Sequence, residues 1–159
     1  MSKKAILFVC LGNICRSPMA EEIFRSIVRK NAVESKYEID SAGLIDYHEG
    51  ELADPRMCFH ASLHDYKLTS RSRPVKSADF ERFDYLVAMD ENNVAGLKKL
   101  ATKPHHEAQI LRMVDFGIRR HETHVPDPYY GGDAGFENVI NILEDACAGL
   151  FEKLERNEL

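Results

Sequence analysis

A cysteine and an arginine near the start of the chain have the spacing of a nucleophile and an anion-binding group. Cys10 closes a run of apolar residues, and Arg16 follows it across the loop Leu-Gly-Asn-Ile-Cys. Spacing alone is weak evidence, because a cysteine lies six positions before an arginine by chance in many unrelated chains. The residues around this pair therefore decide whether it forms a site.

The loop between Cys10 and Arg16 has the composition of a phosphate-binding loop. Gly12 lets the backbone turn its N–H groups inward, and a helix expected after the loop adds the positive end of its dipole. Such a nest fits a dianionic phosphate and stabilises a thiolate at Cys10. The planar guanidinium of Arg16 can clamp two phosphoryl oxygens, which a lysine could not match in geometry.

The alternative is that Cys10 is an ordinary buried residue and Arg16 an ordinary solvated one. That alternative leaves one feature unexplained, because a positive side chain at a helix N-terminus opposes the helix dipole. A bound anion removes the conflict. We therefore predict that Cys10 is a nucleophile and that Arg16 is a phosphate clamp.

These residues resemble those of a known family. The segment Val9–Pro18 is similar to the signature loop of low-molecular-weight protein tyrosine phosphatases. The resemblance implies a four-stranded parallel sheet flanked by helices, and hydrolysis of phosphotyrosine in proteins, or of small aryl phosphates, through a cysteinyl-phosphate. It implies no metal and no other cofactor. Further matching segments are Asp40-Ser-Ala-Gly43, Asp54-Pro-Arg56, Met89-Asp90 and Pro126-Asp-Pro-Tyr129.

A phenolate is a poor leaving group, so this chemistry needs a proton donor, and Asp127 is the candidate. It lies in Val-Pro-Asp-Pro-Tyr-Tyr-Gly-Gly, where two prolines stiffen the backbone and Pro128 keeps the preceding residue extended. From composition alone an ordinary turn aspartate is the alternative. In the family that this chain resembles, the aspartate of the matching Asp-Pro motif is the general acid, so the resemblance assigns that role to Asp127.

The resemblance also assigns the remaining site residues. A hydrogen-bond network of Asn13, Ser17 and Ser41 would support the loop, although Ser17 could equally cap a helix whose first position is Pro18. Exposed tyrosines would wall the pocket, although ordinary packing is an equal alternative. The predicted substrate-binding residues are Leu11, Gly12, Asn13, Ile14, Cys15, Ser17, Tyr47, Tyr129 and Tyr130, with Ser41 in a supporting role.

Cys15 lies in the same loop as Cys10 and could capture an oxidised Cys10 in a protective disulfide, as in some members of the family. A small packing thiol is the alternative. The sequence also departs from the family at two places. Residues 68–74 lack the histidine that many relatives carry there, so we expect part of the loop-supporting network to be rearranged. The loop of residues 45–50, with Tyr47, is a variant that leaves the substrate preference open.

Apolar runs without alternation predict strands that are buried on both faces of a parallel sheet, with helices between them. We therefore predict an α/β fold in three layers: a four-stranded parallel sheet, helices on both faces, and the phosphate-binding loop after the first strand. The predicted strands are residues 5–10, 37–41, 85–89 and 108–113. Predicted helices cover residues 18–30, 77–83, 91–100 and 136–154, and one more starts near Pro55 with Met57, Cys58, Ala61 and Leu63 inside.

The composition fits one globular domain that spans residues 1–159. A net charge of -5 gives no broad attraction for nucleic acid, and four irregularly spaced cysteines fit a reducing compartment. The apolar run after Lys3 and Lys4 ends within seven residues without a cleavage pattern, so we interpret it as a strand rather than a signal peptide. We expect a cytoplasmic monomer or weak dimer, with no nucleic-acid partner and no membrane insertion.

Two other functions remain open from the sequence. An arsenate reductase of similar fold would need an added cysteine pair in a mobile segment after the second helix, and residues 67–82 contain no cysteine. A phosphotyrosine-binding module without turnover would have no need for Cys10, Arg16 and Asp127 together.

Overall fold

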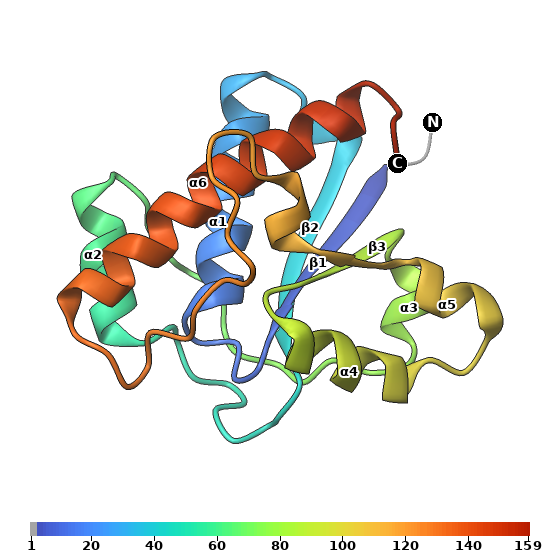
Figure 1. Ribbon diagram of the computed structural model, residues 1–159, viewed down its shortest axis with the longest axis horizontal. Coiled ribbons are helices and arrows are strands. Elements are labelled where there is room, and N and C mark those ends of the chain that lie inside the picture. The colour runs from blue at the N-terminus through green and yellow to red at the C-terminus, as the bar shows by residue number, and fades with distance from the viewer. Residues whose placement is uncertain (1–2) are drawn as a thin grey trace.

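A four-stranded parallel sheet forms the centre of the computed structural model, which describes residues 3–159 (Figure 1). The strand order is β2-β1-β3-β4, so the first strand lies inside the sheet. Each strand pairs in parallel with its neighbour, which confirms the predicted sheet. The strands are β1 (Lys4–Cys10), β2 (Tyr37–Gly43), β3 (Tyr85–Ala88) and β4 (Ile110–Arg112).

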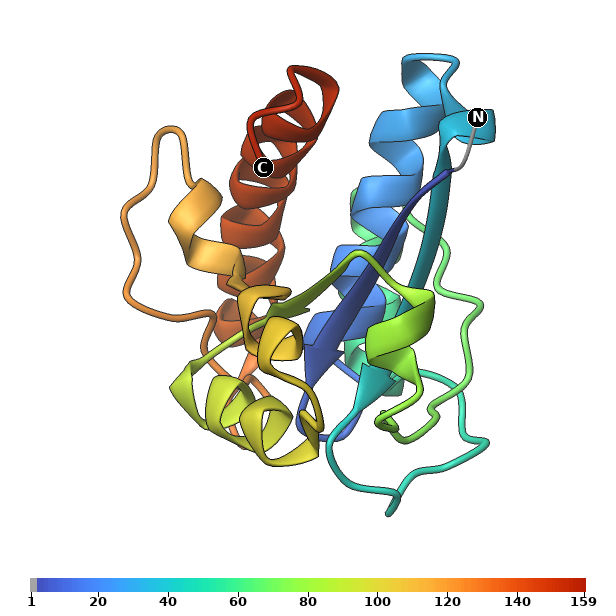
Figure 2. The same cartoon turned by 90° about the vertical axis from the view of Figure 1, so that its right-hand side faces the viewer.

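The side chains of β1 explain why helices cover both faces of the sheet. Ile6 and Phe8 pack into one hydrophobic core, whereas Leu7 and Val9 pack into another on the opposite side. The three predicted layers are therefore confirmed (Figures 1 and 2). On the first side lie α1 (Arg16–Lys30), α2 (Pro55–Leu63) and α6 (Asp133–Glu155), and on the second lie α3 (Asp79–Arg82), α4 (Glu91–Leu100) and α5 (Pro104–Ala108).

The fourth strand is shorter than expected. Pro104 starts the helix α5, and the backbone N–H groups just before it donate to the ring of His106. The helix extends through Ala108, so only three residues remain for β4. Two short 3₁₀ helices are also present. Glu34–Lys36 lies in a connection for which no element was predicted, and Met113–Phe116 takes up the last residue of the predicted fourth strand.

The inner face of α2 is narrower than expected. Met57 and Ala61 are four residues apart and both are fully buried. Leu63 is exposed and Cys58 is half-buried, so the prediction that both lie inside the helix's packed face is wrong. The two residues lie off the line that connects Met57 and Ala61 along the helix.

No helix among residues 3–159 combines the length and the apolar character needed to cross a membrane.

Candidate active site

The loop between β1 and α1 turns polar groups toward the sulfur of Cys10. The backbone N–H of Asn13 lies 3.3 Å from Cys10 Sγ, and the N–H of Ser17 lies 3.5 Å from it. The hydroxyl of Ser17 is 3.0 Å from the same sulfur. Asn13 has a φ of 57°, a left-handed conformation that asparagine tolerates better than most residues. The loop therefore has the shape of an anion-binding nest with Cys10 Sγ at its base.

The side chain of Asn13 connects this loop to its surroundings. Its Nδ2 donates to the hydroxyls of Ser17 at 2.8 Å and Ser41 at 3.0 Å, and its Oδ1 accepts from the N–H of Arg73 at 3.1 Å. Ser41 in turn donates to a carboxylate oxygen of Glu21 at 2.5 Å. Buried polar atoms that are fully paired hold one geometry, so this network fixes the loop from behind.

The position of Ser17 differs from one of the two expectations. α1 begins at Arg16, with Cys15 at the N-cap and no side-chain capping bond. The alternative in which Ser17 caps a helix that begins at Pro18 is therefore wrong. The hydroxyl of Ser17 contacts Cys10 and Asn13 instead, and Ser17 belongs to the loop-supporting network.

Two contacts from distant segments also hold the loop, and the sequence analysis missed both. A Cβ atom on Gly43 would lie 2.9 Å from the carbonyl oxygen of Leu11, so only glycine lets β2 approach this closely. The hydroxyl of Ser72 donates to the carbonyl oxygen of Gly12 at 3.0 Å. Ser72 lies in the segment of residues 68–74, where many relatives carry a histidine. In this protein the Ser72 hydroxyl and the backbone N–H of Arg73 are the groups of that segment that bind the phosphate-binding loop.

Arg16 is buried and held from two sides. Its Nη1 donates to Asp90 Oδ2 at 2.7 Å and to the carbonyl oxygen of Val125 at 3.0 Å, while Nη2 lies 3.7 Å from Asp127 Oδ2. Burial opposes the charged form, but the Cys10 sulfur and the hydrogen-bonded Asp90 carboxylate outweigh burial and raise the pKa of Arg16. Arg16 is therefore a fixed cation beside the sulfur.

Asp90 makes two contacts through its two carboxylate oxygens. Its Oδ1 accepts from the backbone N–H of Asn93 at 2.8 Å and caps α4. Its Oδ2 pairs with Arg16 across the sheet. The second contact depends on the juxtaposition of the ends of β1 and β3, which no local pattern could show.

Asp127 lies across the pocket from the phosphate-binding loop. Its side chain is 40% exposed. One carboxylate oxygen accepts from the backbone N–H of Tyr129 at 3.0 Å, and the other is the oxygen near Arg16. The structure therefore brings together Cys10, Arg16 and Asp127, although more than a hundred residues separate the first two from the third.

A pocket of about 400 Å³ lies over the loop. Ile45 and His48, which the sequence analysis did not single out, also line it. Tyr47 and Tyr130 project far into solvent, and Tyr130 is 94% exposed. Asn13, Ser17 and Ser41 are not among the lining residues, because they support the loop from behind. The predicted residues that line the pocket are Cys10, Leu11, Gly12, Ile14, Cys15, Arg16, Tyr47, Asp127, Tyr129 and Tyr130.

Cys15 shares the pocket with Cys10 but differs from it in character. Burial, and then the negative charges of Asp54 and Cys10, raise the pKa of the Cys15 thiol well above its usual range. Cys15 is therefore a thiol at neutral pH and a poor nucleophile. All four cysteines are free, and the protective disulfide between Cys10 and Cys15 stays a prediction.

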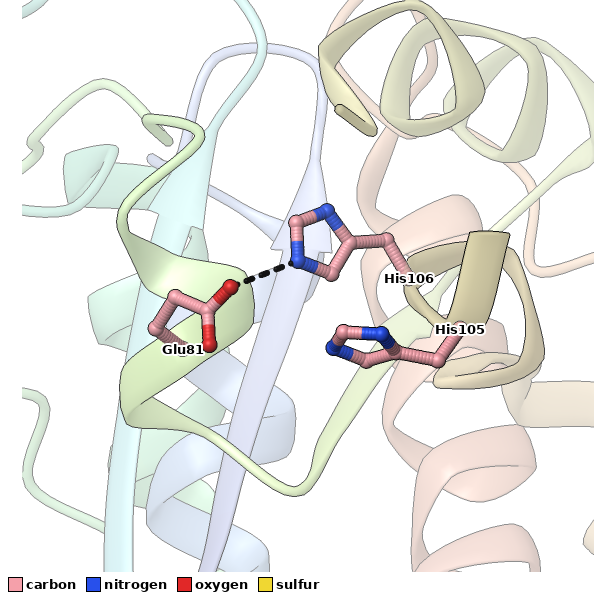
Figure 3. Close-up of side chains that lie close together, drawn as sticks. All are labelled: Glu81, His105 and His106. Atoms are coloured by element: carbon pink, nitrogen blue, oxygen red, sulfur yellow. Dashed lines mark hydrogen bonds and ion pairs between the residues drawn. The ribbon is translucent and has the colours of Figure 1, made fainter. Parts of the chain in front are cut away.

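Glu81, His105 and His106 lie close enough together to share a metal ion (Figure 3). The ring of His106 disfavours that use. Its Nδ1 accepts backbone N–H groups from Thr102 and Lys103, so its Nε2 carries the proton and donates it to Glu81 at 2.9 Å. A metal at Nε2 would have to displace that proton while Nδ1 stays occupied. The ammonium of Lys103 also occupies Glu81. Glu81 therefore forms a hydrogen-bonded cluster with His106 and Lys103, and the ring of His105 packs edge-on against that of His106.

Comparison with known proteins agrees with this geometry. Residues 5–159 match the family model of the low molecular weight phosphotyrosine protein phosphatases. A low molecular weight protein-tyrosine-phosphatase of Streptomyces coelicolor is 42% identical over 91% of this chain and 90% of its own length. A low molecular weight phosphotyrosine protein phosphatase of Sus scrofa is 34% identical, with 95% of this chain and 96% of its own length covered.

The fold has equally similar solved structures. A crystal structure of a protein tyrosine phosphatase from Entamoeba histolytica, with Hepes in its active site, superposes with a TM-score of 0.96 at 47% identity. The superposition covers 99% of this chain and all of the other. The protein is thus an α/β phosphate-binding protein whose loop and sheet match those of phosphatases. It belongs to the low-molecular-weight phosphotyrosine protein phosphatase family.

Proposed function

We propose that the protein hydrolyses phosphotyrosine in proteins, and small aryl phosphates, through a cysteinyl-phosphate on Cys10. The observation that carries this proposal is the meeting of three groups in one pocket. Cys10 Sγ lies at the base of a nest of N–H groups, Arg16 is a fixed cation beside it, and the carboxyl group of Asp127 lies opposite.

The first half of the reaction transfers the phosphoryl group to sulfur. The Cys10 thiolate attacks phosphorus while the backbone N–H groups of the loop and Arg16 hold the equatorial oxygens. The bond between phosphorus and the phenolic oxygen breaks, and Asp127 donates a proton to the leaving oxygen. The products of this half are tyrosine and the cysteinyl-phosphate.

The second half releases phosphate. The Asp127 carboxylate takes a proton from a water molecule as that water attacks phosphorus. The bond between phosphorus and sulfur breaks, and the electron pair returns to Cys10 as a thiolate. The Ser17 hydroxyl, 3.0 Å from the sulfur, donates to that leaving thiolate. The proton that Asp127 took from water replaces the one that it donated in the first half, so the enzyme returns to its starting state.

The pocket walls favour a flat ring over a small or charged group. Ile14 and Ile45 are apolar, and Tyr47 and Tyr129 stand at the rim. One solved structure with 30% identity and a TM-score of 0.87 is that of a Drosophila arginine phosphatase, so phosphoarginine is the substrate to compare. We expect the guanidinium of phosphoarginine to gain less binding free energy from these apolar walls than the phenyl ring of phosphotyrosine.

We propose further that residues 1–159 form a single domain that works in the cytoplasm as a monomer or weak dimer. Four free thiols support a reducing compartment. Light scattering across a range of protein concentrations tests the oligomeric state, and a stable dimer at low concentration would refute this part.

The decisive assay compares matched peptides that carry phosphotyrosine, phosphoserine or phosphoarginine, with a chelator present. We expect turnover of phosphotyrosine alone, and its loss in Cys10→Ser, because a serine hydroxyl is not ionised at neutral pH. Substantial turnover by Cys10→Ser, or a preference for phosphoarginine, would overturn the proposal. Binding of phosphotyrosine without turnover would indicate a binding module.

A further inference from the structure

The helix α2 contacts both halves of the active site. At its start, the backbone N–H of Asp54 donates to the carbonyl oxygen of Ile14 in the phosphate-binding loop at 2.8 Å. Asp54 also holds the guanidinium of Arg56 with two bonds, at 2.9 and 3.1 Å. That guanidinium lies 5.3 Å from the ring of Tyr129 and 4.9 Å from the ring of Phe136. The first turn of α2 therefore connects the phosphate-binding loop with the segment after Asp127.

His60, one turn further along α2, joins the helix to the start of α6. Figure 1 shows these two parts of the fold side by side. The ring is almost parallel to that of Phe136, at 2°, with centroids 5.6 Å apart. Its Nδ1 lies 2.7 Å from Glu137 Oε2, and its Nε2 lies 3.3 Å from Asp133 Oδ1. The His60 side chain is only 6% exposed.

The two nitrogens of the His60 ring face two different carboxylates of α6. Nδ1 lies close to Glu137, and Nε2 lies at a longer distance from Asp133. His60 therefore links the first residue of α6 with the residue one turn later, and its stacked ring covers Phe136 between them.

This link lies directly after the loop that carries Asp127. Asp133 begins α6 six residues after Asp127, and the Tyr129 N–H in between donates to the Asp127 carboxylate. The loop's end is thus anchored by α6, and the start of α6 is anchored by His60. We propose that His60 is a positioning residue for the general acid, which sets where Asp127 sits over the phosphate-binding loop. The proposal rests on the function proposed above.

A second histidine on α2 makes a control possible. His64, one turn further along the helix, donates from Nε2 to Glu137 Oε1 at 2.7 Å, and its Nδ1 lies 3.9 Å from Glu144 Oε1. Neither ring nitrogen of His64 is hydrogen-bonded to Asp133. His64 therefore shares the packing and one carboxylate with His60, but it binds α6 further from the Asp127 loop.

The test measures kcat/KM over a series of aryl phosphates, from phenyl phosphate to p-nitrophenyl phosphate, which differ in their need for a proton. His60→Phe keeps the stacked ring and loses both hydrogen bonds. We expect it to lose about 3- to 10-fold more activity on phenyl phosphate than on p-nitrophenyl phosphate, a part of the ~10²- to 10⁴-fold that general acid catalysis contributes. We expect His64→Phe to lower kcat/KM by the same factor on both esters.

A second variant covers the case in which His60→Phe does not fold. Asp133→Asn changes a side chain that is 91% exposed and should shift the ester ratio in the same direction by a smaller factor. An unchanged ratio in the folded His60 variant, or in Asp133→Asn if that variant alone is folded, would overturn the inference. An equal shift in His64→Phe would overturn it as well.

Asp127→Asn, measured in the same series, separates the two proposals. If Asp127→Asn makes the rate depend steeply on the leaving group and His60→Phe does not, the inference fails and the general acid stands. If Asp127→Asn leaves the dependence unchanged, the proposed acid role fails, and the positioning role fails with it.

Discussion

The pair formed by Arg16 and Asp90 allows a stability prediction worked from atoms. Asp90 uses one carboxylate oxygen for the Asn93 N–H at 2.8 Å and the other for Arg16 Nη1 at 2.7 Å. In Asp90→Asn the amide has a single carbonyl oxygen. It can cap α4 or accept from Arg16, but not both. Because asparagine caps as well as aspartate does, we expect the cap to survive and Arg16 to lose its partner.

The cost follows from burial. Breaking a fully buried pair by removing one partner costs ~3 to 5 kcal/mol. The side chain of Arg16 is 3% exposed but that of Asp90 is 22% exposed, so water replaces part of the lost contact. The carbonyl oxygen of Val125 also stays bonded to Arg16. We therefore expect Asp90→Asn to lower the free energy of unfolding by about 2 kcal/mol, and Asp90→Ala by about 1 kcal/mol more because the cap is lost.

Urea unfolding of both variants measures these values, and an Arg16→Met background supplies the control. In that background no guanidinium is left without a partner, so Asp90→Asn should change the free energy of unfolding little. The difference between the two backgrounds gives a coupling energy of about 2 kcal/mol. An equal cost in both backgrounds, or a cost below about 0.5 kcal/mol in the parent, would refute the reasoning, since that is the usual range for ordinary surface substitutions.

Three further predictions concern the phosphate clamp, the packing of Gly43 and the cluster around Glu81. Arg16→Lys should lose about 10²-fold or more in kcat on phosphotyrosine peptides, nearly as much as Arg16→Ala, because an ammonium lacks the planar fork; a near-normal lysine variant would show that charge alone suffices. Gly43→Ala should lower the free energy of unfolding by about 1 to 3 kcal/mol, because the new Cβ would meet a loop carbonyl oxygen at 2.9 Å; an unchanged thermal midpoint would contradict this. Hydrogen bonds from Lys103, and then from His106, lower the pKa of Glu81 from 4.5 to about 2. The unfolded chain therefore binds more protons in this window, and the stability that Glu81 contributes above pH 4.5 is lost as the pH falls toward 2; Glu81→Gln should flatten the unfolding profile there, and superimposable profiles would argue against the cluster.

The centre of the sheet was predictable because its inner strands, β1 and β3, are buried on both faces. A strand such as β1 must then be apolar along its whole length, and the run of residues 5–10 is visible without any partner. The long amphipathic helix α6 was predictable because its buried residues recur at helical spacing, although it begins three residues earlier than expected. β4 was predicted poorly, since the helix α5 takes up Ala108 at one end of the predicted strand and a 3₁₀ helix takes up Met113 at the other.

The site likewise has a part that is local in sequence and a part that depends on the fold. Cys10 and Arg16 belong to one short segment, so local sequence and a family resemblance indicated both. Contacts across the fold were not visible, because nothing in the sequence near Gly43 or Ser72 shows that each packs against the phosphate-binding loop. For Ser17 the sequence left two roles open, helix capping and support of the loop, because the choice depends on the position of the Cys10 sulfur.

The pocket wall was predicted in kind rather than in full. Tyr47, Tyr129 and Tyr130 do surround the opening, but His48 and Ile45 complete the lining. His48 pairs with Glu51 at 2.7 Å and lies beside Tyr129, with ring centroids 6.3 Å apart. A histidine in a polar loop is usually a solvated surface residue, so its type and spacing carried no signal of this contact.

The central claim is that the phosphoryl group passes through the sulfur of Cys10. The most direct test mixes the enzyme with a phosphotyrosine peptide, quenches the reaction in acid on the millisecond timescale, and maps the modified residue by mass spectrometry. We predict one phosphoryl group on Cys10, formed at least as fast as steady-state turnover and absent in Cys10→Ser. Turnover with no phosphoryl-enzyme at any time, or with the phosphoryl group on another residue, would contradict the mechanism.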